Sequence, residues 1–426
     1  MPPPIEKKMH TLLSRRKSLS SFRTLTTFPP TSLDFSSNDF LSLSTSPLLR
    51  TSYLHELTTS PSFRLGSTGS RLLDGNSSYA ENLETSIAEF HNAEAALLFN
   101  SGFDANEGFF ACVPQEGDVV VFDEMVHASV REGMRLSRAG KRVSFRHCDV
   151  GDLKRVLEEV NARDMEVREG RRNVFVAVES LYSMDGDLAP LREIVDVVEE
   201  TLGRNGNGLV VVDEAHATGV YGEKGRGLVC ELGLEGRVYA RLHTFGKALG
   251  SNGAAILCSA LTREYLINYA RPLIYTTAMG FPSLAAIKVV YSLMREGRTE
   301  ALRFRLNELI EHMYCKLKAL QPFTRDVITG TEIVQIPPEM PRSPIFSLLM
   351  PEPRSLARHC QVAGFVVRPI MPPTVPEGTQ RVRVCLHAGN THDDIERLVA
   401  TIKEWLLLQE KRAQKGGTED FIKAVL

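Results

Sequence analysis

Short continuous runs of hydrophobic residues alternate along the chain with longer stretches in which hydrophobic positions recur every three or four residues. Four such runs lie in the first half, at Ala95–Phe99, Val119–Phe122, Val174–Val178 and Leu209–Val212. Because the runs are continuous rather than alternating in polarity, we expect buried parallel strands covered by helices on both faces. The pattern predicts a doubly wound α/β domain whose chemistry gathers at the carboxyl ends of its strands.

Two capping-box patterns mark expected helix starts. Ser78 is followed three residues later by Glu81, and Thr391 by Asp394, and hydrophobic residues at helical spacing follow each pair. The first pattern predicts a helix just before the Ala95–Phe99 strand, and the second predicts one near the end of the chain.

Beyond about residue 281 the pattern changes to helix-rich segments with three isolated strands, at Ile345–Leu349, Val366–Arg368 and Val382–Leu386. This is typical of a smaller α+β domain. We therefore expect four parts: a basic N-terminal segment or helix (1–35), a large domain (36–280), a small domain (281–410) and a polar tail (411–426).

Composition excludes several classes of protein. The 426 residues carry 50 Lys+Arg against 52 Asp+Glu, so the net charge of -2 creates no general field for nucleic acid. The 7 Cys show no C-x-x-C spacing, which predicts neither a disulfide framework nor a metal site. No apolar run approaches the roughly 20 residues of a membrane helix.

The first residues of the chain are compatible with more than one cellular compartment. Arg15, Arg16, Lys17 and Arg23 lie in an acid-free, Ser/Thr-rich segment that suits an organelle transit peptide or a basic helix of the fold. The C-terminal Ala-Val-Leu resembles a peroxisomal S-K-L address only weakly. We expect a cytoplasmic protein, with peroxisome and mitochondrion as alternatives.

The string Val210-Val-Val-Asp213-Glu-Ala-His216 imitates the DEAH box of a helicase. That interpretation requires a G-x-x-x-x-G-K-[ST] phosphate loop, and none occurs in the sequence. A dehydrogenase is disfavoured as well, because no G-x-G-x-x-G joins a strand to a helix.

An acid at a strand end can instead hold a protonated ring nitrogen. The string His243-Thr-Phe-Gly-Lys247-Ala-Leu-Gly250 supplies a matching amine, with glycines that allow the backbone to turn tightly around it. A Lys in an apolar cavity loses its proton more readily and can form a Schiff base. Asp213 and Lys247 are thus the pair that a pyridoxal phosphate site requires.

The chain resembles a known family, the α-oxoamine synthases, which are pyridoxal-phosphate (PLP) enzymes of the fold-type-I aminotransferase class. The resemblance runs from about residue 36 to about residue 402 and implies a three-layer α/β/α large domain with a smaller α+β C-terminal domain. It rests on SSNDFLSLS (36–44), GSTGSRLLDGN (66–76), LLFNSGFDAN (97–106), DEMVHAS (123–129), ESLYSMDGD (179–187), VVVDEAHATGVYGEKGRG (210–227), HTFGKALGSNGAAIL (243–257), LIYTTAM (273–279) and RPIMPPTVPEGTQRVRV (368–384).

The resemblance implies roles for the catalytic residues. Lys247 would bind the cofactor covalently and later move the substrate Cα proton, and Asp213 would keep the pyridine nitrogen protonated. His216 would hydrogen-bond the phenolic oxygen of the ring, His127 would stack on its face, and Ser183 would touch the same oxygen or orient it.

Further cofactor contacts are implied around the phosphate. Gly102 and Phe103 would offer backbone N–H groups at a helix N-terminus, a favourable place for an anion. Thr244 would add a hydroxyl. Thr277 matches a residue that reaches the phosphate of the neighbouring subunit in this family, so a homodimer with shared sites is implied.

On the substrate side, Arg383 matches the carboxylate-binding Arg of the family, and a guanidinium can hold a carboxylate by two hydrogen bonds. Asn38, Thr374 and Arg23 match substrate-contacting positions. The resemblance is closest to the branch that condenses L-alanine with pimeloyl-CoA, or its carrier-protein equivalent, in biotin synthesis. Two alternatives stay open: a relative that uses glycine or serine with another acyl-CoA, and a non-catalytic partner subunit.

The sequence departs from the usual family pattern at two single positions. Ser42 stands where the family usually has Gly, and Cys148, in His147-Cys148-Asp149, stands where Asn is common. Neither position lies in a cofactor motif.

Overall fold

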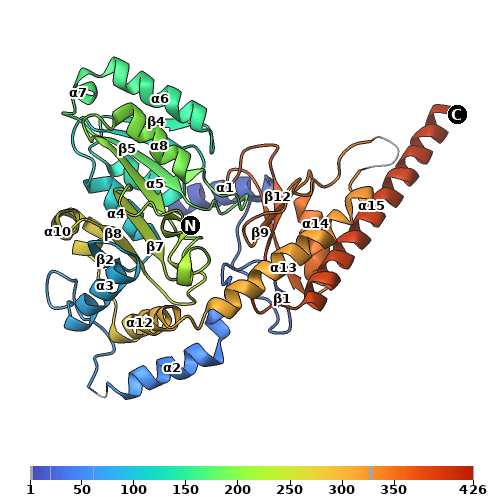
Figure 1. Ribbon diagram of the computed structural model, residues 1–426. Helices are drawn as coiled ribbons and strands as arrows, with labels where there is room; N and C mark the ends of the chain where they lie inside the picture. The colour runs from blue at the N-terminus through green and yellow to red at the C-terminus, as the bar shows by residue number, and fades with distance from the viewer. Residues whose placement is uncertain (1–2, 20, 61, 326–329, 426) are drawn as a thin grey trace.

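A seven-stranded sheet forms the centre of the larger part of the molecule (Figure 1). The structure is a computed structural model that describes residues 3–19, 21–60, 62–325 and 330–425, with side chains to residue 411. The strand order is β2-β8-β7-β6-β5-β3-β4. The strands are β2 (Ala95–Phe99), β3 (Val119–Asp123), β4 (Lys141–Phe145), β5 (Val174–Glu179), β6 (Gly208–Asp213), β7 (Ala240–Thr244) and β8 (Ala254–Cys258).

Successive residues of the central strands enter two different hydrophobic cores. On β3, Val119 and Val121 belong to one core, and Val120 belongs to the other. Helices α4 and α5 contribute to the second core, whereas α3, α6 and α8 contribute to the first, so both faces of the sheet are covered (Figure 1). This burial explains why the strand sequences are continuously apolar, and it confirms the predicted three-layer architecture.

The four predicted strands run in the same direction, but the sheet also contains one reversed strand, β8, which was not predicted. Strands β3 to β7 pair in parallel, but β2 pairs only with β8, in antiparallel register with Leu97 opposite Ile256. β8 is also antiparallel to β7. Continuous hydrophobicity reports that both faces of a strand are buried, and it carries no information on strand direction.

Helices connect the strands and surround the sheet. The helices of the structure are α1 (Pro4–Ser18), α2 (Pro47–Thr58), α3 (Ser78–Phe90), α4 (Gly102–Cys112), α5 (Ala128–Leu136), α6 (Val150–Arg163), α7 (Met165–Arg168), α8 (Leu191–Leu202), α9 (Leu228–Glu231), α10 (Ala260–Tyr269), α11 (Arg271–Ile274), α12 (Phe281–Arg295), α13 (Glu300–Lys318), α14 (Pro353–Val362) and α15 (His392–Val425). Three short 3-10 helices span Leu43–Thr45, Glu223–Gly225 and Gln321–Phe323.

The two predicted helix caps had different outcomes. Thr391 and Asp394 form the expected reciprocal box, in which each side chain accepts a hydrogen bond from the other residue's backbone N–H, at 3.1 and 2.9 Å. The first cap was misplaced by one residue, because Ser77, rather than Ser78, adopts the extended cap conformation and accepts from the N–H of Ala80. Two consecutive serines make either cap possible by sequence alone.

A three-stranded antiparallel sheet, β11-β12-β9, forms the smaller C-terminal part, with β9 at Ile345–Leu349, β11 at Arg368–Ile370 and β12 at Arg381–Cys385. The strand expected at Val366–Arg368 is in fact two strands. β10 (Phe365–Val366) pairs with β1 (Leu33–Asp34), whereas β11 pairs with β12. The N-terminal residues 33–34 thus belong to the C-terminal part of the fold.

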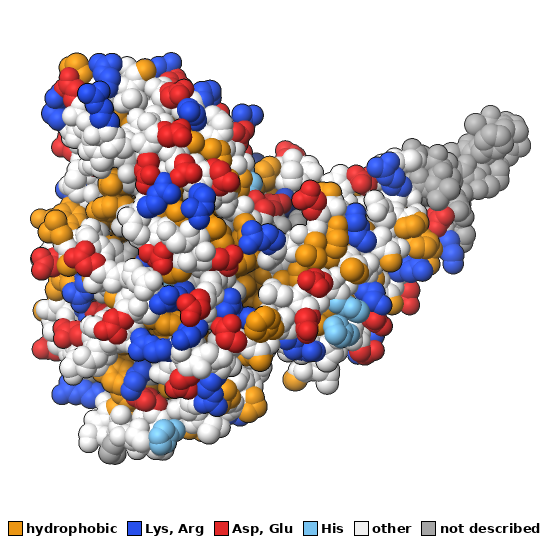
Figure 2. Space-filling view, in the orientation of Figure 1, with side chains coloured by type: hydrophobic (Ala, Val, Ile, Leu, Met, Phe, Trp, Pro, Cys, Tyr) orange, Lys and Arg blue, Asp and Glu red, His pale blue; other side chains and the backbone are white. Residues whose placement is uncertain are grey.

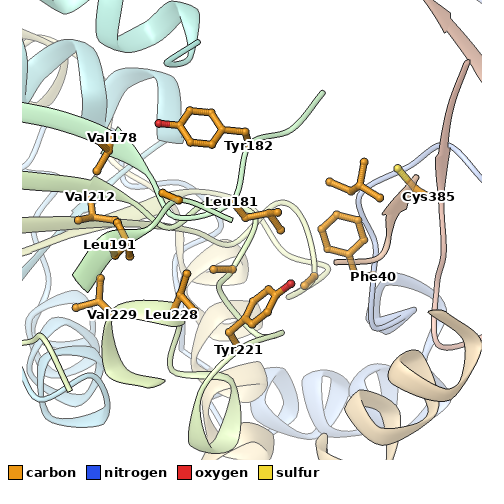
Figure 3. Close-up of a cluster of buried hydrophobic side chains, with 14 of the residues drawn as sticks. Phe40, Val178, Leu181, Tyr182, Leu191, Val212, Tyr221, Leu228, Val229 and Cys385 are labelled. Carbon is orange, nitrogen blue, oxygen red and sulfur yellow. The ribbon is translucent and has the colours of Figure 1, made fainter. Parts of the chain in front are cut away.

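The first hydrophobic core continues from the large sheet into the C-terminal part. Figure 3 shows Val178 and Val212, from β5 and β6, on one side of this cluster and Phe40 and Cys385 on the other. Phe40 is fully buried. The two parts therefore share a packed boundary, and the carboxyl ends of the large-sheet strands face it.

The two ends of the chain lie at the surface. None of the side chains of α1 is buried, and α15 continues to Val425 through most of the tail predicted at 411–426 (Figure 1). Figure 2 shows acidic and basic side chains interspersed over the visible face. Within the described residues, no helix combines the length and the apolar character needed to cross a membrane.

Candidate active site

A cavity of about 240 Å³ opens at the carboxyl ends of β6 and β7, where the sequence predicts the chemistry. Its wall contains seven of the predicted residues: Gly102, Phe103, His127, Asp213, His216, Thr244 and Lys247. Lys247 lies just after β7 and is shared with a second, larger cavity. Burial lowers the pKa of the Lys247 ammonium, and Arg383 acts in the same direction, whereas Asp213 and Glu179 oppose the shift.

Asp213 ends β6 and is held by hydrogen bonds on both carboxylate oxygens. The side-chain amide of Asn106 donates to Oδ2 at 2.8 Å, and the backbone N–H of Ala215 donates to Oδ1 at 2.9 Å. Asn106 also donates to the hydroxyl of Ser129 at 3.0 Å. This arrangement keeps the carboxylate in one orientation toward the cavity.

His127 is the N-cap residue of α5 and lines both cavities. Its Nδ1 lies 2.7 Å from the hydroxyl of Ser129 and accepts from the Ser129 backbone N–H at 3.2 Å. Because Ser129 accepts from Asn106, its hydroxyl proton is free to point at Nδ1, which leaves the imidazole proton on Nε2. Asp213 and His127 are therefore coupled through Asn106 and Ser129.

His216 supplies the clearest sign that this cavity is shaped for a ligand. Its side chain is 5% exposed in the cavity wall, and its Nδ1 has no hydrogen-bond partner among the described residues. Burial, followed by the charge of Lys247, moves the pKa of His216 well below its ordinary value. A buried ring nitrogen without a partner is costly, so a bound group with a polar atom at this place would satisfy it.

The amino end of α4 forms another wall of the cavity. Ser101 caps the helix by accepting from the N–H of Asp104, which leaves the N–H groups of Gly102 and Phe103 facing the cavity as an anion site. A Cβ on Gly102 would meet Cγ2 of Thr244 at 2.4 Å, so only glycine permits this approach of α4 to β7. Thr244 donates its hydroxyl to the carbonyl of Ala215 at 3.3 Å.

The predicted substrate residues meet at the adjoining cavity of about 960 Å³, which is lined by Arg23, Asn38, Ser183, Thr374 and Arg383 among others. Arg383 is 7% exposed; its Nη2 donates to Oδ1 of Asn38 at 2.8 Å and its Nε to the carbonyl of Ser183 at 2.6 Å. Ser183 lines the larger cavity together with His127, His216 and Lys247, and its expected contact with the cofactor ring stays a prediction.

Thr277 is not brought to either cavity. It is exposed, and its carbonyl accepts from the amide of Asn100 at 2.8 Å. The expected contact of Thr277 with the phosphate of a neighbouring subunit stays a prediction.

Among the lining residues of the smaller cavity that were not predicted, three carry polar or charged side chains tied to the predicted ones: Asn106, Ser129 and Glu179. Glu179 ends β5, accepts from the backbone N–H of His127 at 2.7 Å, and has its pKa raised well above the ordinary value, by burial and then by Asp213. A signal existed for Glu179, because it is a carboxylate at the end of a buried strand beside Asp213. Nothing in the local sequence links Asn106 or Ser129 to Asp213.

Comparison with known proteins identifies the family. The model for aminotransferases of class I and II matches residues 30–402. The chain belongs to that family. Within it, the chain is an α-oxoamine synthase relative: it is 54% identical, over 94% of its length and 95% of the other, to a protein of Emericella nidulans named 8-amino-7-oxononanoate synthase.

Other relatives of the family broaden the comparison. The chain is 38% identical to an aminoacyl transferase sphA of Aspergillus fumigatus, covering 90% of this chain and 83% of that one. The solved structure of a serine palmitoyltransferase from Sphingomonas wittichii superposes with a TM-score of 0.78 at 25% identity, covering 93% of this chain and 97% of the other. The chain is thus a PLP-dependent acyltransferase with a fold-type-I architecture.

The cavity fits this cofactor. PLP brings a phosphate, a pyridine nitrogen, a phenolic oxygen and an aldehyde, and the cavity presents an anion site at α4, a carboxylate at Asp213, an unpartnered nitrogen at His216 and an amine at Lys247. The four groups come from three segments, since Asp213 and His216 share one, and they converge on one volume.

Proposed function

We propose that the chain condenses L-alanine with pimeloyl-CoA, or with a pimeloyl group on a carrier protein, to give 8-amino-7-oxononanoate, carbon dioxide and the free thiol, as a step of biotin biosynthesis. The observation that carries this proposal is the 54% identity, over nearly the whole of both chains, to a protein with that name. The joined cavities support it, because Arg383, which we assign to the substrate carboxylate, and Lys247 line the same volume.

When bound, PLP supplies an electron sink that stabilises a carbanion at the amino acid Cα. We assign Lys247 to covalent attachment of the cofactor and to moving the Cα proton, for which its lowered pKa is suited. Asp213, held by Asn106 and the N–H of Ala215, keeps the proton on the pyridine nitrogen.

The remaining cofactor contacts are inferred from the cavity walls. We assign Gly102, Phe103 and Thr244 to the phosphate, His216 to the phenolic oxygen and His127 to the ring face. Gly102, Phe103 and Thr244 would hold the phosphate and Asp213 the ring nitrogen, so these residues together would set how the cofactor is presented to Lys247.

We assign Arg383 and Asn38 to the carboxylate of the amino acid, with Arg23 and Thr374 along the path of the acyl chain. The contact from Nη2 of Arg383 to Asn38 holds the guanidinium plane in place, so a carboxylate would meet it with its geometry already set. Replacing Arg383 with Lys would keep the charge and remove the bidentate geometry.

A homodimer is part of the proposal. The exposed Thr277 would complete the phosphate site of the neighbouring subunit. Two large hydrophobic side chains are exposed as well: Tyr275, two residues before Thr277, at 73%, and Leu73, in the 66–76 segment, at 77%. Residues 67–69 lie beside the segment of Thr277, because the N–H of Ala278 donates to the carbonyl of Gly69.

Lys247→Ala tests the catalytic assignment. We expect turnover to fall roughly 10³-fold or more, since both cofactor attachment and proton transfer are lost, while gel filtration shows an unchanged assembly. Lys154→Ala, at a half-exposed position on α6, is the matched control and should keep full activity. Turnover retained in the Lys247 variant would rule out the mechanism.

The substrate assignment has its own test. The visible spectrum of the holoenzyme is recorded while L-alanine, glycine or L-serine is added, and turnover is then measured with pimeloyl-CoA and palmitoyl-CoA. We expect the largest spectral change with L-alanine and turnover with pimeloyl-CoA. Preference for serine and palmitoyl-CoA would favour the second candidate, which the 38% identity to the sphA transferase keeps open. Absence of any cofactor band, even after PLP is added, would favour a non-catalytic partner subunit.

A further inference from the structure

A second cluster of chemically reactive side chains lies outside the two cavities, where the segments that come after β3, β4 and β5 meet. It comprises Asp123 at the end of β3, His147 and Cys148 after β4, and Asp187 in the loop after β5. Cys148 is one of the two departures of this chain from its family. The proposed catalytic steps use none of the four residues.

The atoms of three of these residues are spaced like the ligands of one small cation. Nε2 of His147 lies 2.8 Å from Oδ2 of Asp187 and 3.8 Å from Sγ of Cys148, and Sγ lies 3.6 Å from the same Oδ2. In a tetrahedral zinc site, neighbouring sulfur, nitrogen and oxygen ligands are separated by roughly 3.3–3.6 Å, as the zinc bond lengths require. Only the imidazole and the carboxylate would have to move apart, by roughly 0.5 Å.

Asp123 orients the imidazole for this role. Its carboxylate lies 2.9 Å from Nδ1 of His147 and also accepts the backbone N–H groups of Met125 and Cys148, each at 2.8 Å. With its oxygens occupied in this way, Asp123 fixes the tautomer that carries the proton on Nδ1, which is the usual partner arrangement of a metal-binding histidine. Tyr182 packs its edge against the ring at 4.4 Å and restricts it further.

An unpartnered oxygen and the partial exposure of the cluster are also compatible with a ligand. Oδ1 of Asp187 is buried and has no hydrogen-bond partner among the described residues. The side chain of His147 is 22% exposed and that of Asp187 is 38% exposed, so the cluster is reachable from solvent and leaves a coordination position for water. Spacing along the sequence could not reveal the cluster, because its members come from three segments.

We propose that His147, Cys148 and Asp187 bind one zinc-class divalent cation, with Asp123 orienting the imidazole. Sulfur and imidazole ligands together select zinc and similar soft cations over Mg²⁺ and Ca²⁺, which prefer oxygen. Binding the cation would release two protons to solvent, the imidazole proton now shared with Asp187 and the thiol proton that Cys148 donates to the same carboxylate. It would also tie the 183–187 loop, whose Ser183 and Asp185 line the larger cavity, to the ends of β3 and β4.

The test uses the full-length holoenzyme, stripped of metal with a chelator and dialysed against Zn²⁺. We expect one bound zinc per chain by atomic absorption, and with Co²⁺ a thiolate-to-metal absorption band. Cys148→Asn should abolish both signals. Asn suits the left-handed backbone of Cys148, at φ 52°, so this variant is expected to fold and to keep its PLP spectrum.

Two further variants sharpen the result. Asp123→Asn should weaken zinc binding roughly 10–100-fold, as loss of an orienting carboxylate does. Cys315→Ser removes an exposed cysteine on α13 and should leave zinc binding unchanged. Absence of zinc from the wild-type protein, equal binding by the Cys148 variant, or loss of binding in the Cys315 variant would each overturn the proposal.

Discussion

At the scale of single residues, the most informative group is a buried pair, Glu214 and His243, next to Asp213. Glu214 and His243 are both fully buried, and Oε2 of Glu214 lies 3.5 Å from Nε2 of His243. Thr218 donates to the carbonyl of Glu214, so Nδ1 of His243 must donate to Thr218, and Nε2 is left as an acceptor. A protonated Glu214 can supply the missing proton, and burial raises its pKa to about 7.

This pair makes stability depend on pH. The folded state holds a proton on Glu214 that the unfolded chain releases near its ordinary pKa of 4.5. The contribution of Glu214 to the free energy of unfolding should therefore fall as pH rises from about 4.5 to about 7, by on the order of 3 kcal/mol, and then level off. His243, whose pKa burial lowers, contributes with the opposite sign below its ordinary value of 6.5.

Glu214→Gln mimics the protonated acid and should remove the pH dependence that Glu214 causes. The free energy of unfolding of the variant should therefore increase relative to that of the wild type as pH rises. Urea unfolding at pH 5 and pH 8 measures the difference. An equal difference at both pH values would contradict the assignment of the proton to Glu214.

Ser42 offers a second residue-scale prediction. It has a left-handed backbone, at φ 53°, and its Oγ accepts from the N–H of Gly389 at 2.9 Å. Ser42→Ala would lose the hydrogen bond and keep the strain, whereas Ser42→Gly would lose the bond and relieve the strain, which costs about 1–2 kcal/mol in a residue with a Cβ. Thermal unfolding should therefore rank Ala below Gly; the reverse order would show that the strain is absent.

At the scale of elements, the close packing of α4 against β7 should affect the affinity for the cofactor. It begins at Gly102 directly after β2, and its close approach to Thr244 depends on the missing Cβ. Gly102→Ala should push the amino end of α4 away from β7 and weaken PLP binding, which can be measured by PLP titration of the apoenzyme.

Gly108→Ala is the matched control, since it lies in the same helix and its added Cβ would meet its nearest neighbours, Ala270 and Phe99, at 3.4 Å. PLP affinity should survive this change. If both variants lost affinity equally, a general perturbation of α4 would replace the specific explanation.

At the scale of the whole molecule, the proposed shared site depends on assembly. Leu73→Asp places a charge among the exposed hydrophobic residues beside the Thr277 segment and should shift a dimer toward monomer, with weaker PLP binding as the accompanying result. Light scattering after gel filtration measures the mass. Leu261→Asp, at a 76% exposed position on α10, is the control that should stay dimeric. A wild-type monomer with full PLP affinity would refute the shared site.

Much of the fold could be predicted because the burial of a strand or helix determines the hydrophobic pattern of its own short segment of sequence. Each strand of the large sheet that contacts both cores has a continuous apolar sequence. The helix cap at Thr391 and Asp394 depends on two residues only three positions apart. The pairing of β2 with β8 and the division of Val366–Arg368 between two sheets depend on which strands become neighbours, and a local pattern does not contain that choice.

The sequence by itself determined the motif chemistry: Lys247 after a strand, Asp213 at the end of another, and glycine where α4 begins. The tertiary structure alone decided which groups meet, because contacts between distant segments arise from packing. Packing brought Ser183 to Arg383, joined Asp213 to His127 through Asn106 and Ser129, and gathered Asp123, His147, Cys148 and Asp187 from three segments.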